Sequence, residues 1–170
     1  MNKALVVIDM QNDFVSGSLG SPHAMDIVAN IKNKTDAAVN NGDVIFFTRD
    51  THEKNYLETR EGKNLPVPHC IRGTWGHEII AELLPLAEGK KIIDKPAFGS
   101  LLLAEALAEG GFDEIELVGL CTDICVVSNA LIIKARLPEA KISVDPDCTA
   151  GITEESRAAA LLVMKMCQVD

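Results

Sequence analysis

Aromatic side chains are scarce in this chain of 170 residues, which has five Phe, one Trp and one Tyr. Proteins that hold single-stranded nucleic acid stack its bases on aromatic surfaces, and they meet the phosphates with an excess of positive charge. This chain has the opposite balance, with 25 acidic against 16 basic residues and a formal charge of −9. We therefore expect no nucleic-acid partner.

Long apolar runs and a paired set of cysteines are also missing. No run approaches the roughly 18 to 20 apolar residues that span a bilayer, and the chain enters a strand-like segment at residue 3 without a signal-peptide pattern. The five cysteines are an odd number without short repeated spacing, which disfavours a disulfide framework. We expect free thiols, no membrane partner and a cytoplasmic location.

Apolar residues make up 47% of the chain, and they are distributed in alternating strand-like and helix-like patterns. The pattern predicts one domain over residues 1–170 with a three-layer α/β/α fold and a mostly parallel sheet of five to six strands. The predicted strands are residues 3–8, 43–48, 91–94, 114–118 and 141–144. The predicted helices are residues 25–41, 76–85, 100–109, 122–136 and 153–166.

One long segment, residues 51–76, shows no clear periodicity and carries charges and prolines. A loop of this length in a compact domain usually serves a function. Two histidines elsewhere, His23 and His77, lack partners by spacing, and we expect them at the surface or as helix caps.

Reactive side chains follow the predicted strands, where an open parallel sheet binds its ligands. They are, in chain order, Asp9, Asp50, His52, Lys95 and Cys125. Because the carboxyl ends of parallel strands meet at one edge of a sheet, we expect these side chains to converge. Motifs of three other classes of protein are missing. The chain has no Gly-x-Gly-x-x-Gly of a dinucleotide-binding fold, no C-x5-R loop of a cysteine phosphatase and no C-x-x-C pair of a thioredoxin-type redox protein.

A carboxylate, an ammonium group and a thiol together make a nucleophilic site. Asp9 can remove the thiol proton of Cys125 and return it to a leaving amine, and Lys95 can stabilise both anions. The thiol lies in the opening turn of a predicted helix, where the helix dipole favours the thiolate form. Backbone N–H groups around Cys121 and Cys125 can hold the oxyanion of an acyl intermediate.

Three sequence blocks resemble the isochorismatase-like cysteine hydrolases. They are Asp9-Met10-Gln11-Asn12-Asp13-Phe14, Lys95, and Gly119-Leu120-Cys121-Thr122-Asp123-Ile124-Cys125-Val126, each after the expected strand. The resemblance covers essentially the whole chain and implies the isochorismatase-like hydrolase fold, with Asp9, Lys95 and Cys125 as the catalytic triad. It also implies a cis peptide bond between Leu120 and Cys121, beside the oxyanion.

The long loop carries a candidate metal site. Asp50 and His52 lie two residues apart in an extended segment, and His69 follows further along. These residues resemble the metal-binding loop of nicotinamidases, and by its spacing Glu61 resembles a further ligand in some members. Mixed oxygen and nitrogen ligands suit one divalent transition metal. We expect Zn²⁺, with Fe²⁺ or Mn²⁺ as alternatives.

The nicotinamidase resemblance implies an amidase that converts nicotinamide to nicotinate with release of ammonia, a role in NAD salvage and a homo-oligomer. Phe14, Leu19 and Phe98 are the pocket residues that we expect. The chain departs from the family near residues 65–67, where Leu65, Pro66 and Val67 replace the usual aromatic residue. The substrate could therefore be a different small amide.

Two alternatives remain. The first is a hydrolase of another small substrate, such as a carbamoyl or ureido compound or isochorismate, although isochorismate hydrolysis needs no cysteine. The second is a catalytically silent module that binds a small molecule. The combination of Asp9, Lys95 and Cys125 disfavours that second reading.

Overall fold

A computed structural model describes residues 2–170 and contains one five-stranded sheet in which every pair of neighbouring strands is parallel. The strand order is β3-β2-β1-β4-β5. The strands are β1 (Lys3–Ile8), β2 (Val44–Asp50), β3 (Lys91–Lys95), β4 (Glu114–Leu120) and β5 (Lys141–Ala150). The predicted fold class is confirmed, with five strands. The strand order of the sheet reverses between β1 and β4. The carboxyl ends of these two strands therefore form the crevice in which such sheets bind ligands.

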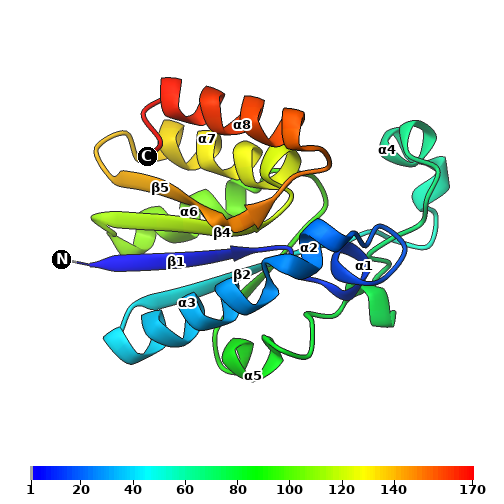
Figure 1. The fold of residues 1–170 in the computed structure, drawn as a ribbon, viewed down its shortest axis with the longest axis horizontal. Coiled ribbons are helices and arrows are strands. Elements are labelled where there is room, and N and C mark those ends of the chain that lie inside the picture. The colour runs from blue at the N-terminus through cyan, green and yellow to red at the C-terminus, as the bar shows by residue number, and fades with distance from the viewer. Residues whose placement is uncertain (1) are drawn as a thin grey trace.

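Helices cover both faces of the sheet (Figure 1). On one face, α6 and α7 pack with α8 over Ala4, Val6 and Ile8 of β1. On the other face, α3 and α5 pack over Leu5 and Val7 of the same strand. The main covering helices are α3 (Val28–Asn41), α5 (Leu84–Ala87), α6 (Leu101–Gly110), α7 (Val127–Arg136) and α8 (Glu154–Met166). Because alternate residues of β1 enter different layers, the strand is apolar from Ala4 to Ile8, as a doubly covered parallel strand requires.

Short elements gather at the carboxyl ends of the strands, on the right of Figure 1. They are α1 (Asn12–Val15), α2 (Pro22–Asp26), η1 (Tyr56–Glu58), α4 (Arg60–Asn64) and η2 (Trp75–His77). The segment that was expected to be a loop thus holds two 3₁₀ turns and one short helix. None of the helices within residues 2–170 is both long and apolar enough to cross a membrane.

The prediction of a helix over residues 76–85 is wrong. That stretch begins with η2, continues without regular structure and ends in α5. Its backbone is held by the segment after β1 instead, since Ile80 N–H donates to Met10 O at 3.0 Å and Asn12 N–H donates to Glu78 O at 3.0 Å. These long-range hydrogen bonds replace the local ones that a helix would use.

Two other predicted elements differ in detail. The helix expected from residue 122 begins as a π-helical turn, η3 (Thr122–Val126), before α7 starts. The last strand continues to Ala150, six residues past its predicted end, and its pairing with β4 shifts register between Leu117 and Gly119. Single π-helical turns are frequent at functional sites.

Candidate active site

Three of the predicted residues meet beyond the carboxyl ends of the sheet. Lys95, the last residue of β3, places its Nζ 2.6 Å from Asp9 Oδ2 and 3.5 Å from Cys125 Sγ. Lys95 and Asp9 have no exposed side-chain surface, and Cys125 is 5% exposed. The structure therefore brings together an acid, a cation and a thiol in one water-poor site.

Asp9 is held by the neighbouring strand. The Thr48 hydroxyl donates to Asp9 Oδ1 at 2.6 Å, and the Asp9 backbone N–H donates to Thr48 Oγ1 at 3.2 Å. The φ angle of Asp9 is +49°, a left-handed conformation that non-glycine residues rarely adopt outside special sites. Burial raises the pKa of Asp9, although the charge of Lys95 opposes this rise. A carboxyl with a raised pKa can both accept and return a proton near neutral pH.

The ammonium group of Lys95 joins two carboxylates. Besides Asp9, it contacts Asp50 Oδ1 at 3.3 Å and donates to the carbonyl of Ala97 at 3.2 Å. Burial alone would lower the pKa of Lys95, but the negative charges of Asp9 and Asp50 raise it. Lys95 is therefore a permanent cation that supplies charge and cannot serve as the base.

The surroundings of Cys125 favour its thiol form, whereas its place in the chain suggests a thiolate. Burial raises the pKa of Cys125 well above its usual range, and the charge of Asp9 raises it further, against the opposing charge of Lys95. Desolvation thus outweighs the nearby cation. A hydrogen bond to Asp9 also favours the protonated thiol, so the carboxylate lies where it can receive this proton.

The backbone around the thiol has three unusual features. The Leu120–Cys121 peptide bond is cis, η3 is a π-helical turn, and Gly119 has a φ of +116°. A side chain at Gly119 would place its Cβ only 2.1 Å from Ile8 O, so glycine alone permits this approach to β1. Asn129 of α7 holds η3 in place, because its side-chain amide donates to Cys125 O at 2.8 Å and to Phe98 O at 3.0 Å.

Four residues form a group that could hold a metal ion beside the triad. Their ligand atoms all lie within 4.8 Å of one another, and they are Asp50, His52, Glu61 and His69. His52 Nε2 lies 2.9 Å from Asp50 Oδ2 and 3.5 Å from Glu61 Oε1. His69 Nε2 lies 3.5 Å from Asp50 Oδ2 and 3.7 Å from Glu61 Oε1. All four residues predicted as ligands are thus together.

These residues fit a divalent cation. Ligands bound at about 2.0 to 2.1 Å in a tetrahedron lie about 3.3 Å apart, which is the range of the observed contacts. The His69 Nδ1–H donates to Val67 O at 2.8 Å, which fixes the ring with Nε2 facing the group. Burial alone would raise the pKa of Asp50, but hydrogen bonds from His52 and His69 hold it below its usual range.

Asp50 links the two halves of the site, because one carboxylate oxygen faces Lys95 and the other faces the histidines. Glu61, the member of the group that comes from α4, is positioned by the close approach of α4 to η1 at Gly62. A Cβ on Gly62 would lie 2.1 Å from Tyr56 O, so only glycine allows α4 to approach η1 this closely. The ring of Tyr56 lies 4.7 Å from that of His52 and shields the group on one side.

A cavity of about 440 Å³ opens onto both the thiol and the metal-type group. Its volume falls within the range of roughly 300 to 1,000 Å³ that small-molecule sites occupy. The three pocket residues predicted from the sequence line it, together with apolar side chains from α2, η3 and the turn before α8. The lining residues are Phe14, Leu19, Ser21, Ala24, Asp50, Glu61, Leu65, His69, Phe98, Leu120, Cys121, Ile124, Cys125, Gly151 and Ile152.

Gln11 and His77 support the site, although the sequence predicts no such role for either. Gln11 is fully buried, and its side-chain amide makes three hydrogen bonds, to Asp50 N–H (2.7 Å), Asp50 O (2.9 Å) and His77 O (2.9 Å). His77 was expected at the surface or as a cap, but it is 4% exposed, with Nε2 2.8 Å from Thr51 Oγ1. Gln11 stands in the Asp9 block, but its position alone does not reveal partners some 40 and 66 residues away.

Comparison with known proteins agrees with this arrangement. Residues 3–169 match the model of the Isochorismatase domain. The crystal structure of a Bacillus subtilis nicotinamidase/pyrazinamidase superposes with a TM-score of 0.86 at 32% identity, covering 97% of this chain and 95% of that one.

Two further solved structures show the range of relatives. A pyrazinamidase of Pyrococcus horikoshii in complex with zinc has a TM-score of 0.87 at 29% identity, covering 100% of this chain and 98% of that one. An N-carbamoylsarcosine amidase of Thermoplasma acidophilum has a TM-score of 0.82 at 27% identity, covering 97% and 94%. These relatives share the fold and differ in substrate.

Proposed function

This chain belongs to the isochorismatase family and is an amidohydrolase of non-peptide C–N bonds, and we propose that it hydrolyses a small uncharged carboxamide, nicotinamide above all, through Cys125. The observation that carries the proposal is the contact of Lys95 with both Asp9 and Cys125, the residue of the three that lines the cavity. A silent binding module would have no need of a buried cation between a carboxylate and a thiol.

The first half of the reaction follows from the protonation states. The Asp9 carboxylate takes the proton of the Cys125 thiol as Sγ attacks the carbonyl carbon of the amide. Lys95 remains charged and stabilises the anion that develops on sulfur. Asp9 then returns the proton to the amide nitrogen, ammonia leaves, and a thioester on Cys125 remains.

The second half uses the same residues in reverse. Asp9 takes a proton from water as the water oxygen attacks the thioester carbonyl, and the carboxylic acid leaves as Sγ regains its proton. Backbone N–H groups of the turn that begins at Cys121 stabilise the oxyanion in both halves. Leu120, Cys121 and Cys125 of this segment line the cavity.

A divalent cation, which we propose to be Zn²⁺, would be held by Asp50, His52, Glu61 and His69. When bound, it supplies a Lewis acid that anchors a basic heteroatom of the substrate or a water molecule. The protein's own contribution is to orient these ligands: the Val67 carbonyl fixes His69, and Gln11 fixes the backbone of Asp50.

Charge favours an uncharged amide over the alternatives. None of the cavity-lining residues in the described part of the chain is Arg or Lys, whereas Asp50 and Glu61 are among them. Lys95 is fully buried and already paired with two carboxylates. Carbamoyl amino acids, ureido acids and isochorismate all carry carboxylate groups, for which the cavity lining offers no Arg or Lys; the one cation they could meet there is a metal ion held by Asp50, His52, Glu61 and His69, whose charge Asp50 and Glu61 already offset.

A screen for ammonia release tests the proposal. The purified protein is incubated with nicotinamide, pyrazinamide, a carbamoyl amino acid and a ureido acid, with Cys125→Ala as the control. We expect release from the two uncharged amides and none from Cys125→Ala. Faster release from either anionic compound would contradict the charge argument, and release by Cys125→Ala would contradict the nucleophile.

A further inference from the structure

The outer wall of the cavity is formed by the short turn between β5 and α8. Within it, Gly151 and Ile152 line the cavity, and Ile152 is 62% exposed. An apolar side chain on the rim of a cavity can be shielded from water by a ligand that enters the cavity. The position of this turn therefore determines how much room a substrate has beyond the reacting amide.

Asp123 connects this turn to the nucleophile. It lies in η3, two residues before Cys125, and its Oδ2 accepts the backbone N–H of Ile152 at 2.9 Å. The same oxygen accepts the hydroxyl of Ser156, in the first turn of α8. One carboxylate thus joins the turn that carries the thiol to the turn that carries the rim.

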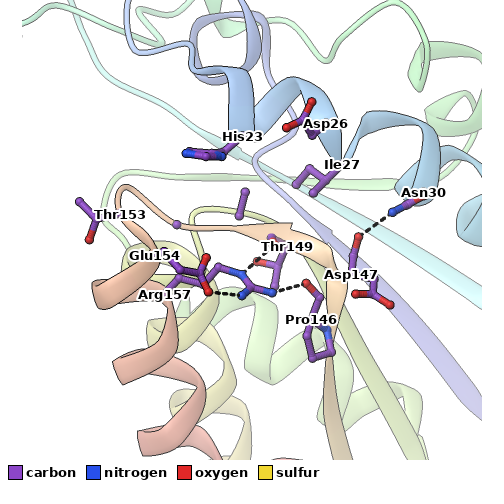
Figure 2. Close-up of a pocket in the computed structure, with 12 residues that line it drawn as sticks. His23, Asp26, Ile27, Asn30, Pro146, Asp147, Thr149, Thr153, Glu154 and Arg157 are labelled. Carbon is purple, nitrogen blue, oxygen red and sulfur yellow. Dashed lines mark hydrogen bonds and ion pairs between the residues drawn. The ribbon is translucent and has the colours of Figure 1, made fainter.

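The approach of the two turns requires glycine at position 151. A Cβ there would lie 3.1 Å from Asp123 Oδ2 and 2.7 Å from Arg157 Cβ. Arg157 of α8 holds the strand that leads into this turn, donating to Pro146 O at 2.6 Å and to Thr149 O at 3.4 Å in β5 (Figure 2). Asp123 thus holds the rim itself, and Arg157 holds the end of β5 from which the rim starts.

We propose that Asp123 is a positioning residue that sets Ile152 at a fixed distance from Cys125, and that Ile152 is thereby a residue that determines substrate size. This inference rests on the proposed amidase function. Asp123 does not line the cavity, so its effect on substrate size is exerted through Ile152. A substrate with one small ring passes the rim, and a substrate extended by a second ring meets Ile152.

The test compares nicotinamide with quinoline-3-carboxamide, which extends the same amide by a fused ring. The measured quantity is the ratio of kcat/KM for the larger amide to that for nicotinamide. We expect Ile152→Ala and Asp123→Ala to raise this ratio about tenfold, which is the scale of discrimination by an apolar pocket. Asp123→Asn keeps an acceptor for the Ile152 N–H and should restore the ratio to within about twofold of wild type.

The matched control is Leu162→Ala, because Leu162 is 61% exposed on α8 and lies outside the cavity. It removes the same amount of exposed apolar side chain and should leave the ratio unchanged. An unchanged ratio in Ile152→Ala, or an equal rise in Leu162→Ala, would refute the role of Ile152. An Asp123→Ala protein with the wild-type ratio would refute the role of Asp123.

A second measurement does not depend on turnover. Hydrogen exchange at the Ile152 amide should be faster in Asp123→Ala than in wild type, because its acceptor is gone, and slow again in Asp123→Asn. Equal exchange in all three proteins would overturn the positioning claim. Wild-type protein that hydrolyses neither amide would overturn the proposed function instead, and the claim for Asp123 would be decided by the exchange rates.

Discussion

Replacing Gln11 with leucine should destabilise the fold and weaken the metal site together. The Gln11 side chain makes three buried hydrogen bonds, two of them to the backbone of Asp50 and one to His77 O. Each such bond contributes about 1 kcal/mol, and leucine leaves all three backbone groups without a partner, so the loss is about 3 kcal/mol. For a chain of this length, a loss of that size lowers the melting temperature by about 6 to 12 °C.

The assay is urea unfolding in the presence of a chelator, so that bound metal does not contribute to the free energy of unfolding. Metal titration of the folded variant follows, and we expect the affinity to fall by about 10-fold to 100-fold because Asp50 is no longer held. Asn33→Leu, at an exposed position of α3, is the matched control. A loss of stability no larger than that of the control, or an unchanged metal affinity, would refute the reasoning.

Three further predictions concern charge, metal and protons. Lys34 contacts Glu116 Oε1 at 2.7 Å and Asp145 Oδ2 at 2.6 Å, and it holds the pKa of Asp145 below its usual range against the raising effect of burial. This stability is present above the ordinary carboxyl pKa and is lost as pH falls through the lowered pKa of Asp145. Lys34→Met should therefore cost about 1 kcal/mol at neutral pH, and this cost should disappear at the acid end of pH titrations of unfolding. Elemental analysis should find about one transition metal per wild-type chain and far less in His69→Ala, with exposed His23→Ala as control; an unchanged metal content in His69→Ala would remove it from the ligand set. Because burial raises the pKa of Asp9, the acid limb of the kcat/KM profile should lie above the ordinary carboxyl range, and a limb at about pH 4 or below would show that Asp9 is not the base.

The sheet and the site residues at its edge could be predicted because their signals are local. Each strand is a short apolar run, and Asp9, Asp50 and Lys95 stand at or just past the end of one. Parallel strands with right-handed connections leave little freedom in where those ends meet. The grouping of Asp50, His52 and His69 followed from their spacing and from family resemblance, and the structure brings them together with Glu61.

What the sequence could not reveal depends on contacts between distant segments. The apolar residues at 79, 80, 83 and 84 have a helical spacing, yet Ile79 and Ile80 pair with the segment after β1, so no helix forms there. Gln11, Asp123 and Asn129 act through hydrogen bonds to partners 29 or more residues away. The raised pKa of Cys125 is likewise a result of its burial, which the helix position alone cannot convey.

Capture of the acyl-enzyme tests the central claim most directly. The protein is mixed with nicotinamide, quenched in acid within one turnover and analysed by mass spectrometry of the peptide that contains both Cys121 and Cys125. The account predicts a nicotinoyl thioester on Cys125 alone, retained in Cys121→Ala and absent in Cys125→Ala. A thioester on Cys121, or turnover of nicotinamide by Cys125→Ala, would contradict it.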